Sequence, residues 1–522
     1  MPPALDELSA PRLPATDDGF FPLFARHAAT TPERVFAHIG ERALTFGALN
    51  QQSAMLADWL RGNGARSGDR IALMLRNGDT TLAMMLAIAR TGAVWVPVNP
   101  QAVGDNLAYV LEHSSPRIVV AEPDLMQVIA ASRADLRSAM TVEAGALPLG
   151  DHSTAAGPTD EPVPADAPFA IMYTSGTTGR PKGVLVSHRM LRLAGEAAAL
   201  VSSARDGDVF YLWEPLFHIG GAQMMVLPLT RRVRLVVAER FSAGRLWADV
   251  RASGATHIHY LGGILQILLK QPPAPLDRLH SVRIAWGGGC PREVWRPFEE
   301  RFGVTIRECY GMTECSSFTT ANLDGRVGSV GRPLPWFDVA LVDDAGRPVA
   351  QGERGEIVVR ERLPGALTRG YFNEPQATTR SLRNGAFHTG DLASADAAGN
   401  LYIHGRTTDS VRVRGENVAA VEVEDVARKH PAVEDCAMIG VAADVGEGAI
   451  KLFVELRAGM SLAPQEISDW LAPRLARYQR PRYIAMVENF ERTPSQRIMK
   501  HKLSKRTDDT WDATAGKGDG LA

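Results

Sequence analysis

Short apolar runs alternate with helical patterns between residues 46 and 121, and this alternation restricts the possible fold more than any other feature of the chain. The segment 46–60 repeats apolar residues at helical spacing and ends at Gly62-Asn63-Gly64, which is typical of a helix stop. Buried strands are predicted at 71–75, 93–98 and 118–121, and further helices at 80–90 and 106–113. Such an alternation predicts an α/β fold with a parallel sheet covered on both faces, which binds ligands at the carboxyl ends of its strands.

The sequence changes character twice along the chain. Beyond Val327, apolar and polar residues alternate between glycine turns, which predicts antiparallel strands at 337–342, 355–359 and 399–404. Near Arg406 the pattern changes again, and residues 410–505 resemble a compact α+β unit. We therefore expect a disordered leader at 1–18, a large body at 19–405, a hinge at 406–409, a C-terminal cap at 410–506 and a disordered tail at 507–522.

The composition excludes several classes of protein. The 522 residues carry 57 Lys and Arg against 59 Asp and Glu, so charge gives no reason to expect a nucleic-acid partner. The four cysteines form no CxxC pair, which disfavours a zinc site and favours a reducing cytoplasm. No segment approaches the roughly 20 uninterrupted apolar residues that span a bilayer, and the N-terminus has no signal-peptide pattern. The composition leaves the oligomeric state open.

The segment Ile171 to Val184, IMYTSGTTGRPKGV, places four hydroxyls, three glycines and one lysine after an apolar run. Glycines let backbone N–H groups approach phosphate oxygens, hydroxyls donate to them, and a lysine supplies a mobile positive charge. The segment differs from a Walker A loop because Lys182 precedes Gly183 and a strand-like run. We interpret it as a polyphosphate-binding loop, and the alternative is an ordinary polar surface turn.

This loop resembles the phosphate loop of the adenylate-forming superfamily, which includes acyl-CoA synthetases, amino-acid adenylation domains and beetle luciferases. Five further segments resemble its motifs in order: ECYGMTE at 308–314, GSVGRP at 328–333, FHTGD at 387–391, GRTTD at 405–409 and GENV at 415–418. The likeness covers about residues 20–505. It implies a large N-terminal domain of layered parallel and mixed sheets with a β-barrel-like part, and a small mobile α+β C-terminal domain.

The resemblance implies a site for ATP or AMP, with Mg²⁺. Tyr310 would stack on adenine, Thr313 would donate to the α-phosphate, and Glu314 would bind Mg²⁺. Asp391 would accept the ribose hydroxyls, and Arg406 would donate to ribose or phosphate. The other nucleotide-binding residues implied are Thr174, Ser175, Gly176, Thr177, Thr178, Gly179, Lys182, Gly288, Gly289, Cys290, Glu308, Cys309, Gly311 and Met312.

The acid and the thiol have their own expected residues. His218 stands where amino-acid-activating relatives have an aspartate for the substrate ammonium, so an α-amino acid is disfavoured; a hydrogen-bonded core histidine is the alternative. The resemblance places the acid against His218, Gly221, Tyr260, Gly263, Trp286, Gly287 and Gly311. Small residues there favour a bulky or branched apolar acid, and the alternative is that these glycines allow close helix packing. Asp409 would be the pivot of the hinge, with Arg414, Gly415 and Glu416 beside the pantetheine arm of CoA.

One segment departs from the family pattern. Relatives carry Pro-Ser-Gly-Lys-Ile near the C-terminus, where the lysine acts in adenylation, and this chain has Pro494-Ser495-Gln496-Arg497-Ile498. Arginine keeps the charge but is planar and longer, so it need not fit the same site. Either Arg497 performs the step, or Lys500 supplies the charge, or the enzyme performs only thioester formation from an acyl-AMP supplied by a separate adenylating enzyme.

These observations predict an ATP-dependent acyl-CoA ligase for an apolar, non-amino-acid carboxylic acid, with ATP, Mg²⁺ and CoA as cofactors and co-substrates. Lys182, Thr313, Glu314, Arg497 and Lys500 are the candidate catalytic residues. The main alternative is the thioester-forming half reaction alone. Loading of a carrier protein, luciferase-like oxygen chemistry and non-catalytic binding of an acyl-adenylate are weaker alternatives.

Overall fold

The structure is a computed structural model that describes residues 19–149, 162–174, 181–407, 410–413, 416–442, 448–493 and 497–515. The described residues divide into two compact units, Met1–Val339 with Val359–Phe387 and Ala340–Val358 with His388–Ala522. The division differs from the one expected near residue 406, because 340–358 and 388–405 group with the C-terminal residues. The expected leader at 1–18 and the pivot Asp409 lie outside the described residues.

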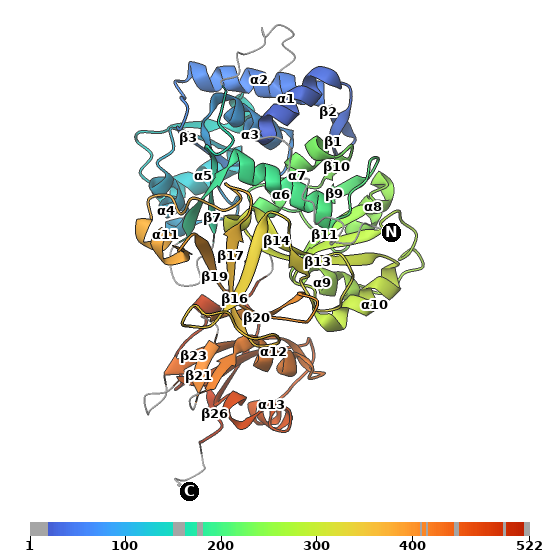
Figure 1. Ribbon diagram of the computed structural model, residues 1–522, viewed down its shortest axis with the longest axis vertical. Coiled ribbons are helices and arrows are strands. Elements are labelled where there is room, and N and C mark those ends of the chain that lie inside the picture. Colours follow the sequence, from blue (N-terminus) through green and yellow to red (C-terminus); the bar gives the residue numbers. More distant parts are fainter. Residues whose placement is uncertain are drawn as a thin grey trace. The chain divides into compact units, whose positions relative to one another are not determined.

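One sheet of the first unit contains the predicted strand and helix alternation (Figure 1). Its strand order is β6-β5-β3-β4-β7-β8, and every neighbouring pair is parallel except β7 and β8. The strands are β3 (Arg70–Met74), β4 (Val94–Pro97), β5 (Ile118–Ala121), β6 (Met140–Glu143), β7 (Pro168–Thr174) and β8 (Lys182–Ser187). Helix α2 (Phe46–Gly62) precedes β3, and the segments between the strands contain α3 (Asp79–Thr91), α4 (Gly104–Ser114), α5 (Pro123–Ser132) and the 3₁₀ turn Ala144–Ala146. The parallel sheet expected from the sequence is confirmed.

Burial explains why these segments fold as they do. Every residue of β4 and β5 is buried, as expected of strands covered on both faces. From Thr81 to Thr91 the helix α3 is buried all round, which accounts for its Ala-, Leu- and Met-rich sequence. The left-handed Gly92 then ends α3.

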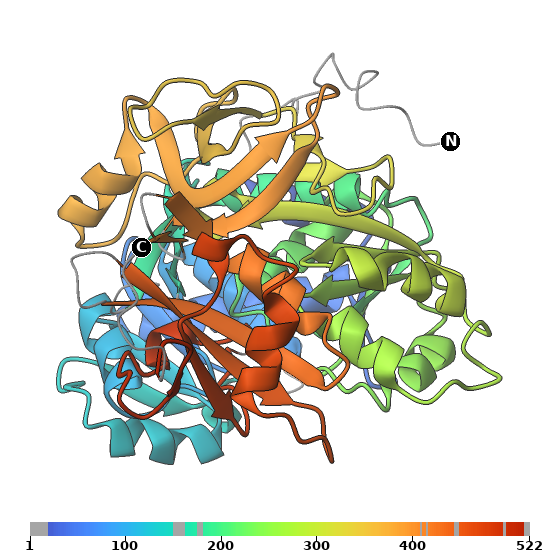
Figure 2. The same cartoon turned by 90° about the horizontal axis from the view of Figure 1, so that it is seen from below.

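A second, larger sheet has the order β15-β14-β13-β12-β11-β9-β10-β1-β2, with parallel strands from β13 to β1 and antiparallel strands at both edges. Its strands are β1 (Val35–Ile39), β2 (Arg42–Thr45), β9 (Val209–Leu212), β10 (Arg234–Val237), β11 (His257–Leu261), β12 (Ile284–Gly288), β13 (Thr305–Met312), β14 (Ser317–Asn322) and β15 (Arg332–Pro333). Its helices are α1 (Phe20–Thr30), α6 (His188–Val201), α7 (Ile219–Thr230), α8 (Leu246–Ser253), α9 (Ile264–Lys270), α10 (Arg292–Phe302) and the 3₁₀ turn Thr313–Cys315. Helices α6 and α7 pack against each other, and so do α9 and α10, which are yellow-green in Figure 2.

The predicted antiparallel strands beyond Val327 form a further sheet, with the order β16-β17-β19-β18 and β20 paired to β19. They are β16 (Phe337–Val342), β17 (Gly355–Glu361), β18 (Leu382–Arg383), β19 (Ala386–Ala395) and β20 (Leu401–Arg406), with α11 (Pro375–Ser381) before β18. The boundaries between the two units fall inside β16, β17 and β19.

The C-terminal residues form the expected α+β fold around the sheet β23-β24-β25-β26. The elements are β21 (Ser410–Val413), β22 (Glu416–Ala419), α12 (Ala420–Arg428), β23 (Val433–Ala442), β24 (Gly448–Leu456), α13 (Pro464–Leu471), β25 (Tyr483–Val487), β26 (Trp511–Asp512) and the 3₁₀ turns Arg477–Gln479 and Lys500–Lys502. The expectation of a disordered tail from 507 is wrong for its first residues. Trp511 packs on the apolar core of this unit, and Asp512 lies 3.2 Å from the guanidinium of Arg482.

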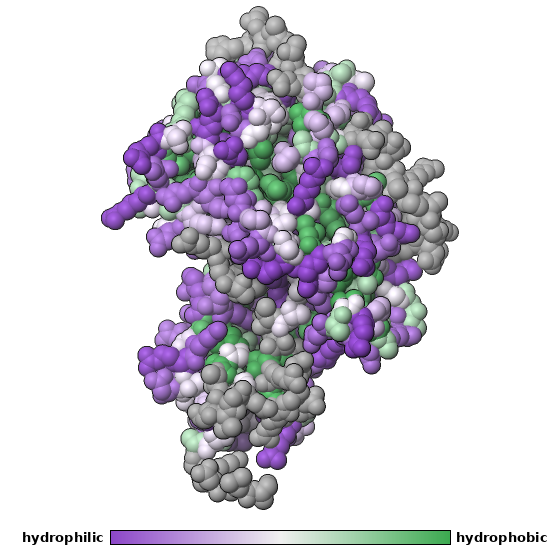
Figure 3. Space-filling view, turned by 60° about the vertical axis from the view of Figure 1, so that its left-hand side comes forward, coloured by the Kyte–Doolittle hydropathy of each residue, from purple (hydrophilic) through white to green (hydrophobic). Residues whose placement is uncertain are grey.

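Among the described residues, no helix is long and apolar enough to cross a membrane. Most residues on the face in Figure 3 are hydrophilic, and hydrophobic residues show as small areas between them. The large apolar residues that are exposed are scattered along the sequence: Val103, Met140, Leu276, Leu279, Met460 and Met486. Single exposed apolar residues of this kind are ordinary on protein surfaces.

Candidate functional site

The two ends of the predicted phosphate loop are held by a β-hairpin. Thr174 ends β7, Lys182 begins β8, and the two residues are partners in the antiparallel register. The Thr174 hydroxyl donates to the carbonyl oxygen of Lys182 at 3.5 Å. Ser175, Gly176, Thr177, Thr178 and Gly179 lie outside the described residues, so their roles stay predictions. Lys182 is therefore fixed at the base of the loop.

Tyr371 connects Lys182 to Glu314. The Lys182 ammonium lies 5.2 Å from the centre of the Tyr371 ring, and the Tyr371 hydroxyl donates to Oε1 of Glu314 at 2.9 Å. Burial, together with the adjacent Glu314 carboxylate, raises the pKa of Tyr371, so its hydroxyl stays protonated and can donate. Tyr371 forms a β-bridge with Val184, and Phe372 N–H donates to the Gly183 carbonyl at 2.8 Å. The backbone of this segment is thus joined to the strand that carries Lys182.

Thr313 and Glu314 lie in the 3₁₀ turn directly after β13, and both are buried. The Glu314 carbonyl accepts the N–H of Thr368 at 2.8 Å. Gly311 makes this turn possible, because a Cβ at that position would lie 1.8 Å from the Ser317 carbonyl oxygen. Tyr310 and Met312 are half-buried on the same strand. The structure therefore brings the motif residues Tyr310 to Glu314 to one end of the large sheet.

Glu308 contacts the neighbouring glycine segment. Its carboxylate accepts hydrogen bonds from the Tyr260 hydroxyl at 2.5 Å, from Gly289 N–H at 2.5 Å and from Cys290 N–H at 3.1 Å. Burial raises the pKa of the Glu308 carboxyl to about 7, although these donors favour the ionised form. Cys309 is buried beside it, with its Sγ 2.9 Å from the Gly287 carbonyl. Glu308 therefore shapes the loop that was predicted to face adenine.

The glycines at 287 and 289 permit close approach of backbones. A Cβ on Gly287 would lie 1.8 Å from the Tyr260 carbonyl oxygen, and one on Gly289 would lie 3.1 Å from Cα of Gly262. Gly288 ends β12 between them. This packing leaves a wall without side chains, which is compatible with the predicted adenine contact.

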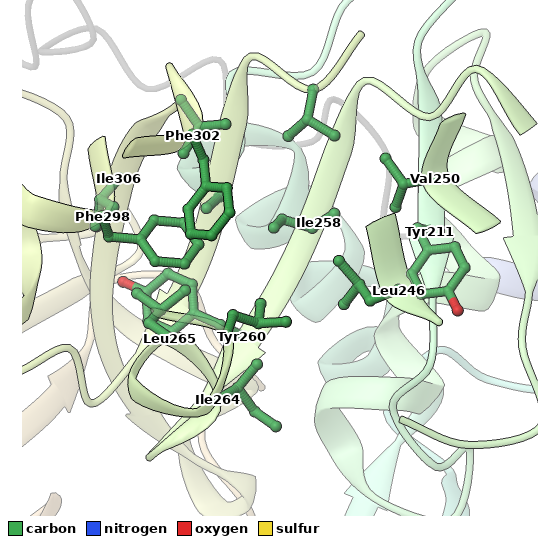
Figure 4. Close-up of a cluster of buried hydrophobic side chains, with 14 of the residues drawn as sticks. Tyr211, Leu246, Val250, Ile258, Tyr260, Ile264, Leu265, Phe298, Phe302 and Ile306 are labelled. Atoms are coloured by element: carbon green, nitrogen blue, oxygen red, sulfur yellow. The ribbon is translucent and has the colours of Figure 1, made fainter. Parts of the chain in front are cut away.

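The residues predicted to contact the acid fall on two faces of β11 and β12. Trp286 is fully buried, and its ring centre lies 4.6 Å from that of His259. Tyr260 follows His259 and points to the opposite face, into the apolar cluster with Leu265 and Phe298 that Figure 4 shows. Its role in binding the acid stays a prediction.

The other predicted acid contacts lie at the start of α7 and near α9. His218 is the half-buried N-cap of α7. Gly221 is needed where it stands, because a Cβ there would lie 2.1 Å from the Pro215 carbonyl oxygen. Gly263 is half-buried and precedes α9. Their contacts with the acid stay predictions.

In the second unit, Asp391 and Arg406 are register partners on β19 and β20, with Oδ1 and Nε 3.0 Å apart. Glu356, which the sequence did not indicate, accepts Gly390 N–H at 3.0 Å and lies 2.9 Å from Nδ1 of His388. This carboxylate fixes the turn of the motif that carries Asp391.

The C-terminal candidates are placed as follows. Arg497 N–H donates to the Thr493 hydroxyl at 3.1 Å, and Thr493 N–H donates to the Arg497 carbonyl at 2.8 Å, so two hydrogen bonds join these residues. The Lys500 ammonium lies 2.8 Å from Oε1 of the buried Glu424. Glu416 begins β22, whereas Arg414 and Gly415 lie outside the described residues.

A family model described as AMP-binding enzyme matches residues 24–372, and one described as AMP-binding enzyme C-terminal domain matches residues 422–497. This chain belongs to the AMP-binding enzyme family. The crotonobetaine/carnitine–CoA ligase of Salmonella typhimurium is 30% identical over 482 residues, covering 88% of this chain and 93% of the relative. The corresponding ligase of Escherichia coli is 30% identical over 476 residues, covering 87% and 92%.

Solved structures agree with this membership. ATP-bound MatB from Rhodopseudomonas palustris is 27% identical with a TM-score of 0.83 and covers 92% of this chain and 98% of that one. The o-succinylbenzoate CoA synthetase of Bacillus subtilis, in complex with ATP and a magnesium ion, is 26% identical with a TM-score of 0.82 and covers 92% and 98%. As a member of the AMP-binding enzyme family, the chain is an AMP-forming acid–thiol ligase.

The donor set of this AMP-binding enzyme fits Mg²⁺ bound together with phosphate. Within the described ranges, no group of three His, Cys, Asp or Glu side chains is arranged as a metal cage. Glu314 instead offers a single carboxylate, which Tyr371 orients beside Lys182. Mg²⁺ is commonly held by one or two carboxylates plus substrate phosphates, so Glu314 is the residue that would hold it.

Proposed function

We propose that the protein is an ATP-dependent acyl-CoA ligase that activates an apolar, non-amino-acid carboxylic acid through an acyl-adenylate and transfers the acyl group to CoA. The observation that carries this proposal is the Lys182–Tyr371–Glu314 arrangement at the base of the phosphate loop. In this arrangement one tyrosine contacts both a cation, which can bind phosphate oxygens, and a carboxylate, which can bind Mg²⁺. Both groups are needed to bind a polyphosphate together with magnesium.

The reaction has two steps. A carboxylate oxygen of the acid bonds to the α-phosphorus of ATP, and pyrophosphate leaves with the electrons of the broken P–O bond. The CoA sulfur, having lost its proton, then bonds to the acyl carbon, and AMP leaves. Lys182 and Thr313 would meet the charge on the phosphate oxygens, and Glu314 would hold Mg²⁺, which supplies Lewis-acid stabilisation when bound.

The choice of acid rests on this chain's own side chains. His218, where amino-acid-activating relatives carry an aspartate, argues against an α-amino acid. Buried Trp286 favours an apolar acyl body. The relatives are named for crotonobetaine, carnitine and o-succinylbenzoate, so family membership by itself leaves the acid open.

One observation favours the thioester-forming half reaction as a second candidate. Arg497 stands at the position of the adenylation lysine, and the alternative cation Lys500 is paired with the buried Glu424 inside the C-terminal unit. If neither residue serves adenylation, a separate adenylating enzyme would have to supply the acyl-AMP.

A two-armed assay tests the proposal. One arm contains acid, ATP, Mg²⁺ and CoA, and the other contains synthetic acyl-AMP and CoA. Acyl-CoA in both arms supports the complete ligase, and product from acyl-AMP alone supports the half reaction. A panel of acids that yields product in neither arm contradicts both.

A cytoplasmic location belongs to the same proposal. The four cysteines, Cys290, Cys309, Cys315 and Cys436, are free and buried. Unbridged cysteines are typical of proteins in a reducing compartment.

A further inference from the structure

Glu214 is a buried carboxylate at the entry to α7, close to the residues predicted to contact the acid. It is 3% exposed, and its carbonyl accepts the Asn77 side-chain amide at 3.0 Å. Asn77 also accepts Leu216 N–H at 2.8 Å, so this asparagine holds the segment on both sides of Pro215. A Cβ on Gly220 would lie 2.4 Å from Oε1 of Glu214, so the carboxylate packs directly on the glycine of α7.

Beside this carboxylate lie His259 and Trp286. Oε2 of Glu214 is 2.8 Å from Nδ1 of His259. The two atoms are close, but they are not aligned as a hydrogen bond. The rings of His259 and Trp286 contact each other edge to face, and the indole N–H of Trp213 donates to the His259 carbonyl at 2.7 Å. The position of His259 is therefore fixed by its backbone and by ring packing.

Gln223 adds a further polar group to this place. It follows Gly220 by three residues on α7, so both lie on the same side of the helix. In the described part of the chain, four buried side chains on α7, at its entry and on β11 and β12 leave polar atoms without a hydrogen bond: Oε2 of Glu214, Nδ1 and Nε2 of His259, Oε1 and Nε2 of Gln223, and Nε1 of Trp286. Buried polar groups are normally hydrogen-bonded, so a cluster of this kind indicates a missing polar partner.

The charge of the cluster indicates the kind of partner. Among the described residues, Glu214 forms no ion pair with a lysine or arginine, and the partner within ion-pair distance is the His259 ring, which carries a charge only when it is protonated. A buried carboxylate is costly unless a cation compensates it. The nearby aromatic ring of Trp286 also attracts cations through its face. A positively charged nitrogen would compensate the buried carboxylate and would be attracted to the aromatic ring. A neutral alkyl group would do neither.

We propose that Glu214, Gln223, His259 and Trp286 form a subsite for a positively charged nitrogen carried by the acid at a distance from its carboxylate. The inference rests on the proposed acyl-CoA ligase function and changes the acid proposed for it: the acid is still not an α-amino acid, but its otherwise apolar body carries one charged nitrogen. It agrees with His218, because an α-ammonium would lie beside the reacting carboxylate, whereas this ammonium lies further along the acid.

The test uses pairs of acids that differ only in a nitrogen or a carbon. The pairs are γ-aminobutanoate with pentanoate, ε-aminohexanoate with heptanoate, and γ-trimethylammoniobutanoate with its tert-butyl analogue. We expect kcat/KM for acyl-CoA formation to favour the charged member of at least one pair by about tenfold or more. The amine and trimethylammonium pairs separate a hydrogen-bonding ammonium from a purely aromatic and charge contact.

Glu214→Gln is expected to reduce this charged-to-neutral ratio by about tenfold or more. A structural effect, or a site filled by water alone, would change both members of a pair equally and leave the ratio as it was. Glu196→Gln is the matched control, because Glu196 is a carboxylate on α6 already paired with Arg192 at 3.0 Å, and its ratio should not change. If Glu214→Gln does not fold, the subsite is tested by the charged-to-neutral ratio of kcat/KM in the wild type and by the decrease of that ratio in Gln223→Leu.

Binding separates this inference from the ligase proposal. The sulfamoyl-adenosine analogues of the same acyl groups bind without turnover, and their dissociation constants are measured by calorimetry. Absence of product with tight, charge-selective binding contradicts the ligase activity and supports the subsite. Equal or tighter binding of every neutral analogue by the wild type, or a ratio unchanged by Glu214→Gln, overturns the subsite.

Discussion

The Tyr371 hydroxyl donates a 2.9 Å hydrogen bond to Oε1 of Glu314, and the same tyrosine ring lies 5.2 Å from the Lys182 ammonium. Two residues with separate predicted roles, one for phosphate and one for Mg²⁺, thus share one neighbour. Tyr371 is therefore a positioning residue for both.

Tyr371→Phe keeps the ring below Lys182 and removes only the donor to Glu314. We expect the rate of ATP–pyrophosphate exchange to fall by about tenfold and the Mg²⁺ concentration for half-maximal rate to rise, because a hydrogen bond to a charged group contributes about 1.5–3 kcal/mol. The thermal stabilisation by magnesium ATP should shrink in parallel. Tyr211→Phe is the control, since it removes a comparable donor to Asp249 at 3.1 Å. The same loss in both variants would contradict a specific role for Tyr371.

Glu308 predicts a pH dependence of stability. Burial raises its pKa from an ordinary 4.5 to about 7, so between these values the folded protein binds more protons at this site than the unfolded chain does. The free energy of unfolding should therefore fall as pH rises through this window, by about 3 kcal/mol from this residue. Urea titrations of wild type and Glu308→Gln should show that the variant lacks this slope.

Tyr260→Phe gives the same argument an independent check. The Tyr260 hydroxyl stabilises the ionised Glu308, so its removal should raise the pKa further. The fall in stability should then extend to higher pH. Identical slopes in wild type, Glu308→Gln and Tyr260→Phe would mean that another group titrates.

Arg497→Lys tests which half of the reaction the chain retains. If arginine impairs adenylation, the variant should increase ATP–pyrophosphate exchange by about 10²-fold or more, in line with the loss of one charged donor. Thioester formation from acyl-AMP should change little. A wild type that exchanges rapidly and an Arg497→Lys variant that is slower would show that Arg497 itself performs the step.

Lys500→Met should reduce stability, because Lys500 pairs with the buried Glu424 at 2.8 Å. In the variant, Glu424 would still accept the N–H of Met438 at 2.7 Å and pair with Arg428 at 3.3 Å. Because only one of its partners is lost, we expect the free energy of unfolding to fall by about 1–3 kcal/mol. Denaturant unfolding measures it. Unchanged stability with abolished pyrophosphate exchange would instead assign Lys500 to adenylation.

The sequence by itself determined the parallel sheet, the order of the motifs and the family. Apolar periodicity is local, so the strand at 118–121 was predicted with the bounds of β5, and the helix at 46–60 and the strand at 71–75 within two residues of α2 and β3. Motif residues such as Thr313 and Glu314 are contiguous, so their chemistry could also be inferred without a fold.

Only the tertiary structure decided which side chains meet. Tyr371 reaches Glu314 across 57 residues, Tyr260 reaches Glu308 across 48, and Trp511 covers a core that the polar tail sequence did not indicate. The buried Glu214 beside His259 had no signal in spacing or composition. Such partners depend on strand register and on which face each residue presents, and these are set by packing between segments distant in sequence.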